Sequence, residues 1–374
     1  MNKINKILVL HTSAAVGGAE YSLLEFLNNL KGFPIEVHIA LSLQIEKLFR
    51  DRVEIPVQFH PFELSYFRKY HDLKSYFQAF ISLALHNYRI LKLVKKQKIQ
   101  TVYCNTFRTV PYCFAVKLFG KTQVVCHCRD NISSKLTQYL IKKGSDKVIA
   151  VSAAIKNQLS PHVDVKVIYN GVNVTSFSDT KPTKWFHKER NLSPDIQLIG
   201  NIGQIVSWKN QTDYVLIAKE LIKKNVNLHF LLIGNPVDNR YFSLLKQQIN
   251  AFHLDTCFTL TGPVEDIKKY MGELDILLHT AIHEPFGRVI IEAAAASIPV
   301  VAYDSGGLSE IILPGETGFL IQNRDIHQMA EQTFLLLNNP SLRASIGKSA
   351  QRHIAKNFNS IDCANKLCNA LLYD

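Results

Sequence analysis

The sequence has no long apolar run, and this absence excludes one large class of proteins. None of its hydrophobic stretches reaches the ~18 residues that a membrane-spanning helix needs. The apolar segment from Lys6 to Leu10 is too short and too early for the core of a secretory signal peptide. We therefore expect a cytoplasmic protein.

Metal-binding and redox cysteine motifs are absent as well. The seven cysteines, Cys126 and Cys128 among them, form no C-x-x-C pair and no Cys/His set with zinc spacing. Buried, reduced thiols are the expected state. Only 20% of the 374 residues are charged and 47% are hydrophobic, which argues against disorder and suffices for two globular domains.

Acidic residues are scarce in the first half of the chain. Residues 1–180 hold 24 Lys and Arg against 12 Asp and Glu, whereas residues 181–374 hold 19 of each, so the net charge of +12 lies entirely in the first half. Between Tyr66 and Lys98, eight basic residues are mixed with seven aromatic ones. Such a stretch can dock on an anionic membrane surface. Equally, it can be a long helix whose core contacts come from Phe77, Phe80, Ile81, Leu85, Tyr88 and Leu91.

What the chain does contain is a regular alternation of short β-branched runs with helical patterns. This alternation is typical of parallel sheets built from βαβ units. The strands expected in the first half are 6–10, 37–41, 101–104, 123–128, 147–151 and 166–168. Those expected in the second half are 197–202, 228–233, 257–261, 276–279 and 300–303.

The alternation restarts after a break, which predicts two domains. Asn170-Gly171-Val172 and the polar segment that follows it to Pro194 read as the linker. The predicted fold class is α/β, with two Rossmann-like parallel-sheet domains at 1–170 and 171–357. The chain is purely helical after Asn323.

The most informative motif is HEPFGRVIIEAAAASIPVVAY, from His283 to Tyr303. Phe286 and Gly287 leave backbone N–H groups bare where a helix begins, and such an end attracts phosphate. Glu292 lies about two turns into that helix, where a carboxylate can accept the hydroxyls of a ribose. Glu284 lies just before the helix and can meet a sugar beyond the phosphates. The segment therefore predicts a site for a nucleotide diphosphate sugar.

At these residues the chain resembles a known family. Glu284 and Glu292 match the E-x7-E motif of retaining glycosyltransferases of GT-B architecture, and the following IPVVAYDSGGLSEIILPGETGFLI resembles family 4 of these enzymes. The resemblance implies two doubly wound domains facing across a cleft, with a final helix, about 358–374, that returns to the first domain. It also implies that Glu284 positions hydroxyls of the donor sugar, while the acceptor hydroxyl attacks from the leaving-group side.

Further residues match the family's donor site. Gly17 and Gly18 open a helix in a GG-x-E loop, and His127 ends a strand where the family has a histidine facing the transferred sugar. Gly203 and Lys209 fit the pattern that holds the diphosphate, and Gln204 stands where an arginine is expected. We consider Arg288 or Arg129 as replacements for that cation, although either can be an ordinary arginine. Val264 lies in the loop that meets the base in the family.

The chemistry expected is glycosyl transfer without a metal ion or other cofactor. Negative charge grows on the leaving diphosphate, and Lys209 together with the helix start is placed to stabilise it. The chain has no D-x-D triplet, which is the usual holder of a divalent ion in the other large glycosyltransferase fold. The expected donor is a UDP- or GDP-linked sugar. The expected acceptor is a saccharide or lipid-linked hydroxyl in envelope glycan assembly, reached in the cytoplasm or at the inner face of the membrane.

Other functions remain as alternatives. A nicotinamide dehydrogenase is disfavoured because the first loop lacks G-x-G-x-x-G. A nucleic-acid-binding protein is disfavoured because no recognised motif accompanies the basic charge. A non-catalytic nucleotide-sugar-binding protein stays open because of Gln204, and so does a GT-B epimerase or phosphorylase.

Overall fold

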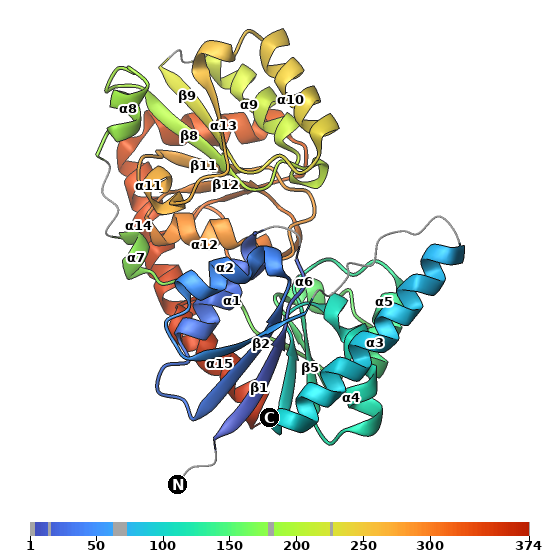
Figure 1. The fold of residues 1–374 in the computed structure, drawn as a ribbon. Helices are drawn as coiled ribbons and strands as arrows, with labels where there is room; N and C mark the ends of the chain where they lie inside the picture. The colour runs from blue at the N-terminus through green and yellow to red at the C-terminus, as the bar shows by residue number, and fades with distance from the viewer. Residues whose placement is uncertain (1–3, 14–15, 63–72, 179–182, 225–226, 374) are drawn as a thin grey trace. The chain divides into compact units, whose positions relative to one another are not determined.

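The computed structural model describes residues 4–13, 16–62, 73–178, 183–224 and 227–373, with side chains omitted for 73–76 (Figure 1). The chain divides into two compact units. Unit 1 comprises Met1–Gly171 with Ser360–Asp374, and unit 2 comprises Val172–Asn359. Each unit is built on its own parallel sheet, so the predicted α/β class with two parallel-sheet domains is confirmed.

Unit 1 has a seven-stranded sheet of order β3-β2-β1-β4-β5-β6-β7. Its strands are β1 (Asn5–Leu10), β2 (Ile35–Leu41), β3 (Val57–Pro61), β4 (Thr101–Cys104), β5 (Gln123–Cys128), β6 (Lys147–Ala150) and β7 (Val165–Val167). Its helices are α1 (Gly18–Asn28), α2 (Leu43–Arg52), α3 (Leu73–Gln97), α4 (Phe114–Phe119), α5 (Lys135–Gly144), α6 (Ala153–Lys156) and α15 (Ser360–Leu372), with a 3-10 helix η1 (Phe107–Cys113). Within this unit, α1 packs against α15, and α3 packs against η1 and α4 (Figure 1). The central strands are buried because helices cover both faces of the sheet.

Unit 2 has a six-stranded sheet of order β10-β9-β8-β11-β12-β13. Its strands are β8 (Gln197–Ile202), β9 (Leu228–Ile233), β10 (Phe258–Gly262), β11 (Ile276–His279), β12 (Val300–Tyr303) and β13 (Phe319–Ile321). Its longer helices are α9 (Gln211–Ile222), α10 (Asn239–Ala251), α12 (Arg288–Ala295), α13 (Ile326–Asn338) and α14 (Pro340–Asn357). Its short ones are α7 (Thr175–Ser178), α8 (Trp185–Glu189), α11 (Ile267–Met271), η2 (Ser207–Lys209), η3 (Asp255–Cys257) and η4 (Gly306–Glu310). Helix α9 packs against α10 and α13, and α12 packs against α14.

The predicted strands agree with the structure to within two residues at each end, but two strands were missed. Both missed strands, β3 and β13, lie at a sheet edge and are only partly buried, so neither reads as a continuous apolar run. The chain after Asn323 is helical, as expected. The segment predicted as a linker contains the short helices α7 and α8, both in unit 2.

In the part of the chain that the structure describes, no helix has both the length and the apolar composition that crossing a bilayer requires.

Candidate active site

Each sheet has one point at which its strand order reverses. This point lies between β1 and β4 in unit 1, and between β8 and β11 in unit 2. Ligands of open α/β sheets bind beyond the carboxyl ends of the strands at such a point. Residues predicted for the site follow these strands in both units.

In unit 2 a buried carboxylate joins the two strands at the reversal. Glu284, five residues beyond the end of β11, accepts from Lys209 Nζ at 2.6 Å and from His279 Nε2 at 2.9 Å, both on its Oε2 atom. Lys209 ends η2, which follows β8, and His279 is the last residue of β11. The structure therefore brings the predicted Lys209 and Glu284 into direct contact.

The electrostatics of this cluster favour an ionised carboxylate. Burial alone would raise the pKa of Glu284, but the charge of Lys209 and the hydrogen bond from His279 outweigh it and lower the pKa from 4.5 to about 2. Burial lowers the pKa of His279, so its ring is neutral near pH 7. An ionised carboxylate only accepts, so His279 carries its proton on Nε2. The cluster thus holds one positive and one negative charge.

A tight loop fixes the backbone of Glu284. Its N–H contacts Ser305 Oγ at 3.1 Å, and its carbonyl oxygen accepts from Gly307 N at 3.0 Å. Gly306 has a φ of +57°, and a Cβ atom built on it would lie 1.9 Å from that carbonyl oxygen. Only glycine fits such an approach. The Gly306-Gly307 pair therefore sets the position of the carboxylate.

Lys209 is held on several sides. Its Nζ lies 4.4 Å from the centroid of the Trp208 ring, and its carbonyl accepts from Thr280 Oγ1 at 3.0 Å. Gly203 lies beside its stem, because a Cβ atom on this glycine would be 3.6 Å from Lys209 Cε. The ammonium has three donors and Glu284 takes one, so it can serve a further anion.

Gln204 and Val264 were also predicted for the site in unit 2. Gln204 accepts on its backbone carbonyl from Gln211 Nε2 at 2.9 Å. Val264 is half-buried and lies between β10 and α11.

Helix α12 begins where the motif predicted, but its arginine already has a partner. Gly287 is the N-cap residue, with a φ of +103°. Arg288 Nε donates to Glu292 Oε1 at 2.6 Å, a pair four residues apart on one helix face. Phe286 is buried and its ring packs on Phe358, so its side chain serves the core of unit 2. The Arg288 charge is therefore offset by Glu292 in this structure.

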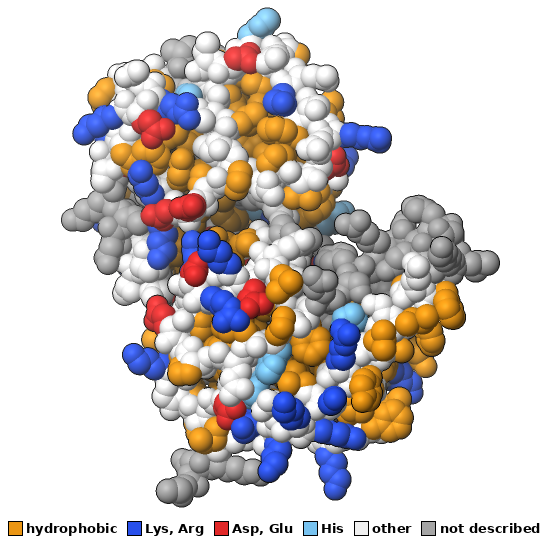
Figure 2. Space-filling model, viewed as in Figure 1, with side chains coloured by type: hydrophobic (Ala, Val, Ile, Leu, Met, Phe, Trp, Pro, Cys, Tyr) orange, Lys and Arg blue, Asp and Glu red, His pale blue; other side chains and the backbone are white. Residues whose placement is uncertain are grey.

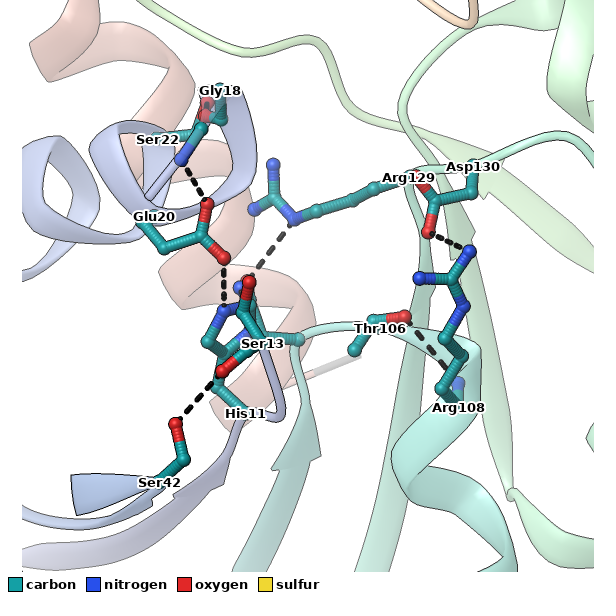
Figure 3. A network of polar contacts seen from close by, with 12 residues as sticks. His11, Ser13, Gly18, Glu20, Ser22, Ser42, Thr106, Arg108, Arg129 and Asp130 are labelled. Carbon is teal, nitrogen blue, oxygen red and sulfur yellow. Dashed lines mark hydrogen bonds and ion pairs between the residues drawn. The ribbon is translucent and has the colours of Figure 1, made fainter. Parts of the chain in front are cut away.

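In unit 1 a buried hydrogen-bond network spans the ends of β1, β4 and β5. His11 follows β1 and contacts Glu20 Oε1 at 2.7 Å through Nε2 and Asn105 Nδ2 at 3.0 Å through Nδ1. Figure 3 shows His11, Glu20 and Arg129 of this network. Arg129 Nε donates to Asn105 Oδ1 at 3.0 Å. Tyr103 donates its hydroxyl to the same oxygen at 3.1 Å. The His11–Asn105 bond crosses the reversal between β1 and β4.

The proton positions follow from these partners. Because the Tyr103 proton goes to Asn105, the Tyr103 oxygen accepts from Arg129 at 3.2 Å and from His127 Nδ1 at 2.7 Å. His127 therefore presents Nε2 as an acceptor, and this buried atom has no partner among the described residues. Burial holds the pKa of His127 well below 6.5, so the ring is neutral. The predicted histidine thus offers one unused acceptor.

The glycine loop of unit 1 is fixed by its acidic residue. Glu20 is buried and accepts from Gly17 N at 2.7 Å through Oε2, and Gly18 is the first residue of α1. Burial raises the pKa of Glu20, but the hydrogen bond and the charge of His11 lower it by a larger amount. The pKa of Glu20 is therefore below its usual value. The GG-x-E pattern thus caps its own helix and anchors His11.

Sequence reasoning missed several members of both clusters. None of His279, His11, Tyr103 and Asn105 was assigned to the site from the sequence. His279 ends β11, His11 and Asn105 directly follow β1 and β4, and Tyr103 is the penultimate residue of β4, so proximity to a strand end is the signal that could have pointed to them. Among the described residues, no group of three or more His, Cys, Asp and Glu side chains is arranged to hold a metal ion.

Comparison with known proteins gives the family. The model described as Glycosyltransferase Family 4 matches residues 16–176, and that described as Glycosyl transferases group 1 matches residues 183–353. A relative from Bacillus anthracis, N-acetyl-alpha-D-glucosaminyl L-malate synthase, is 26% identical over 220 residues, 58% of this chain and 56% of the relative. The capsular polysaccharide biosynthesis glycosyltransferase CapM of Staphylococcus aureus is 27% identical over 229 residues, 57% of this chain and 58% of CapM. The matched part thus spans less than two thirds of either relative.

The fold comparison covers the whole chain. The crystal structure of Anabaena HepE in complex with UDP and glucose superposes with a TM-score of 0.83 at 23% identity, over 99% of this chain and 100% of HepE. That likeness shows a shared fold, and the family models match the two halves in the same order as the two sheets. The chain therefore belongs to the glycosyltransferases of GT-B fold that these two family models describe.

Proposed function

We propose that the chain transfers a sugar from a nucleotide diphosphate sugar, most simply UDP-linked, to an acceptor hydroxyl in the assembly of a cell-envelope glycan. The observation that carries the proposal is the Lys209–Glu284–His279 cluster at the strand reversal of unit 2. Support for the substrates comes from the relatives. HepE has been crystallised with UDP-glucose, and CapM is named for capsular polysaccharide biosynthesis.

Lys209 is the group proposed to stabilise the leaving diphosphate. Cleavage of the bond between the anomeric carbon and the diphosphate places negative charge on the leaving oxygen, and a fixed cation lowers the energy of that state. Lys209 is tied to Glu284 and covered by Trp208, so its charge is already oriented. The N-terminus of α12, which begins after Gly287, adds positive potential for phosphate through the helix dipole.

Glu284 is proposed to orient the donor sugar through its hydroxyls, with retention of configuration. Its Oε2 atom is already engaged by two donors, which suits a positioning group better than a covalent nucleophile. Glu292 is proposed to hold the ribose, and Arg288 to fix the orientation of Glu292.

His127 is proposed to accept a hydrogen bond from a hydroxyl of the transferred sugar. Its Nε2 lone pair is buried and unsatisfied, and a buried acceptor without a partner costs about 1–3 kcal/mol. A sugar hydroxyl would remove that cost on binding. We also propose that the reaction needs no metal ion.

The test begins with a panel of UDP- and GDP-sugars in a tryptophan-fluorescence melt. Both tryptophans, Trp185 and Trp208, lie in unit 2, so the signal reports the proposed donor unit. A donor at one hundred times its Kd stabilises the fold by ~2.7 kcal/mol. If no nucleotide sugar in the panel shifts the melt, the proposed donor class is wrong.

Turnover is then compared in two matched variants. Glu284→Gln keeps the shape of the side chain and removes its charge, so we expect a folded protein with at least ~100-fold slower transfer. Glu220→Gln alters an exposed carboxylate that is paired with Lys223 and should transfer normally. Full transfer by Glu284→Gln would contradict the assigned role.

A non-catalytic nucleotide-sugar-binding protein is the second candidate, and Gln204 is the observation that favours it. A neutral side chain stands there in place of a cation expected from the family pattern. A donor that shifts the melt but is neither transferred nor hydrolysed, with every acceptor offered, would select this candidate.

A further inference from the structure

One face of helix α3 exposes several large apolar side chains to solvent. Phe77, Phe80 and Tyr88 are 65%, 68% and 63% exposed, and Ile81 and Leu85 are exposed as well. The opposite face, with His86, Ile90 and Val94, is buried. The sequence left open whether these aromatic residues form core, and the structure answers that they do not. Residues 63–72, which include the beginning of the Tyr66–Lys98 stretch, lie outside the described residues.

Positive charge lies at the C-terminal end of this apolar face. Lys92, Lys95 and Lys96 are exposed in the last turns of α3, and Figure 2 shows hydrophobic and basic side chains side by side on this part of unit 1. The chain contains no Asp or Glu between Asp72 and Asp130, whereas the same stretch holds ten Lys and Arg. The surface is therefore apolar and basic, with no acidic residue of its own segment to offset the charge.

Other elements of unit 1 also expose large apolar residues. Helix α4 packs against α3 and exposes Leu118 and Phe119, which are 73% and 70% accessible. Helix α5, which packs against η1 as α3 does, exposes Leu136 and Tyr139. A single exposed apolar residue needs no explanation, but a group of this size on adjacent elements marks an interaction surface.

We propose that the α3 face, defined as Phe77, Phe80, Ile81, Leu85, Tyr88, Lys92, Lys95 and Lys96, docks on an anionic lipid bilayer. Aromatic and aliphatic side chains enter the boundary between headgroups and acyl chains, while lysines at the same level meet anionic headgroups. A second copy of the chain would bring the same positive charge against itself, so charge complementarity favours the bilayer as occupant.

The experiment is vesicle flotation of the full chain. It measures binding to lipid and not sugar transfer, so its outcome is independent of the proposed function. We expect binding at low salt to vesicles of phosphatidylcholine with about 30% phosphatidylglycerol, and none to phosphatidylcholine alone. Binding should fall as salt rises, because the screening length shrinks from ~10 Å at 0.1 M to ~3 Å at 1 M. Failure of the wild type to float with the anionic vesicles would overturn the proposal.

Matched variants locate the surface. Phe77→Ser with Phe80→Ser should weaken binding at least ~10-fold through lost apolar contact. Lys92→Ser, Lys95→Ser and Lys96→Ser together should weaken it roughly 100-fold, since each lysine near the surface contributes about fivefold.

The control carries Val237→Ser with Leu244→Ser, which removes two similarly exposed apolar residues from unit 2 and should bind as the wild type does. All these positions are exposed, so the variants should melt like the wild type. Undiminished binding by both α3 variants would refute the assignment. So would a concentration-dependent dimer that the Phe77→Ser, Phe80→Ser variant abolishes, because the occupant would then be a second copy.

Discussion

Replacing Lys209 by Met should destabilise unit 2, because it breaks the buried ion pair with Glu284. The substitution keeps an unbranched side chain beside Trp208 and removes the charge that Glu284 Oε2 meets at 2.6 Å. The surroundings hold the pKa of Glu284 at about 2 instead of 4.5, and a tenfold change in acid dissociation corresponds to ~1.36 kcal/mol. The interactions that ionise Glu284 are therefore worth roughly 3 kcal/mol, and breaking a buried pair typically costs 3–5 kcal/mol.

The pH dependence has a definite sign. The pKa of Glu284 is lower in the folded protein than in the unfolded chain, so the stabilisation is complete above pH 4.5 and is lost as the pH falls towards 2. The difference between wild type and Lys209→Met should therefore be full at pH 7 and shrink below pH 4.5. Urea unfolding followed by tryptophan fluorescence measures it, because both tryptophans lie in unit 2.

Two further variants make this prediction refutable. Lys223→Met breaks an ion pair of similar length, 2.7 Å to Glu220, but an exposed one, and should cost less than ~1 kcal/mol. The double variant Lys209→Met, Glu284→Gln removes both charges and should recover part of the loss. If Lys209→Met unfolds within ~0.5 kcal/mol of the wild type, or no more easily than Lys223→Met, the buried pair does not stabilise unit 2.

Three other outcomes are expected. Gly306→Ala, whose Cβ atom would lie 1.9 Å from the Glu284 carbonyl oxygen, should lower the tryptophan-detected stability by at least ~2 kcal/mol and slow transfer. Gly315→Ala, also at positive φ but in open space, should cost only ~1 kcal/mol. Tyr103→Phe removes a hydroxyl shared by three partners and should lower the circular-dichroism melting temperature through a loss of ~1–3 kcal/mol, while UDP titration of unit 2 stays unchanged. Transfer should be equally fast with and without a chelator; activity lost in chelator and restored by magnesium or manganese would contradict metal-free catalysis.

Central strands could be predicted from the sequence because a parallel strand covered on both faces must be apolar throughout. β9 and β12 are fully buried, and their predicted bounds match the structure. β3 was missed because an edge strand keeps one side in solvent, and its Val57–Pro61 pattern is mostly half-exposed and ends in proline. The sequence therefore did not predict this edge strand, because a strand that is only partly buried does not need an apolar composition.

Some residues of the site could be predicted from the sequence and others could not. Glu284, Lys209 and His127 could be predicted because each lies in a local motif with a fixed relation to a strand end. The partner of Glu284, His279, lies only five residues away, but it contacts Glu284 because the chain turns sharply after β11, and the sequence does not specify that turn. His11 and Asn105 are 94 residues apart, so only the pairing of β1 with β4 brings them together.

The two arginines differ in what surrounds their charge. Arg288 and Glu292 are four residues apart on a predicted helix, a spacing that favours an ion pair, and the structure has one. Arg129 differs, because its three bonded nitrogens donate to neutral acceptors: Asn105, Tyr103 and Asn170. Within the described residues, no carboxylate lies within ion-pair distance of it. No carboxylate of the described residues therefore offsets the charge of this buried guanidinium. Of the two arginines considered in place of the cation missing at Gln204, Arg129 is therefore the one whose charge remains available to an anion, whereas that of Arg288 already meets a carboxylate.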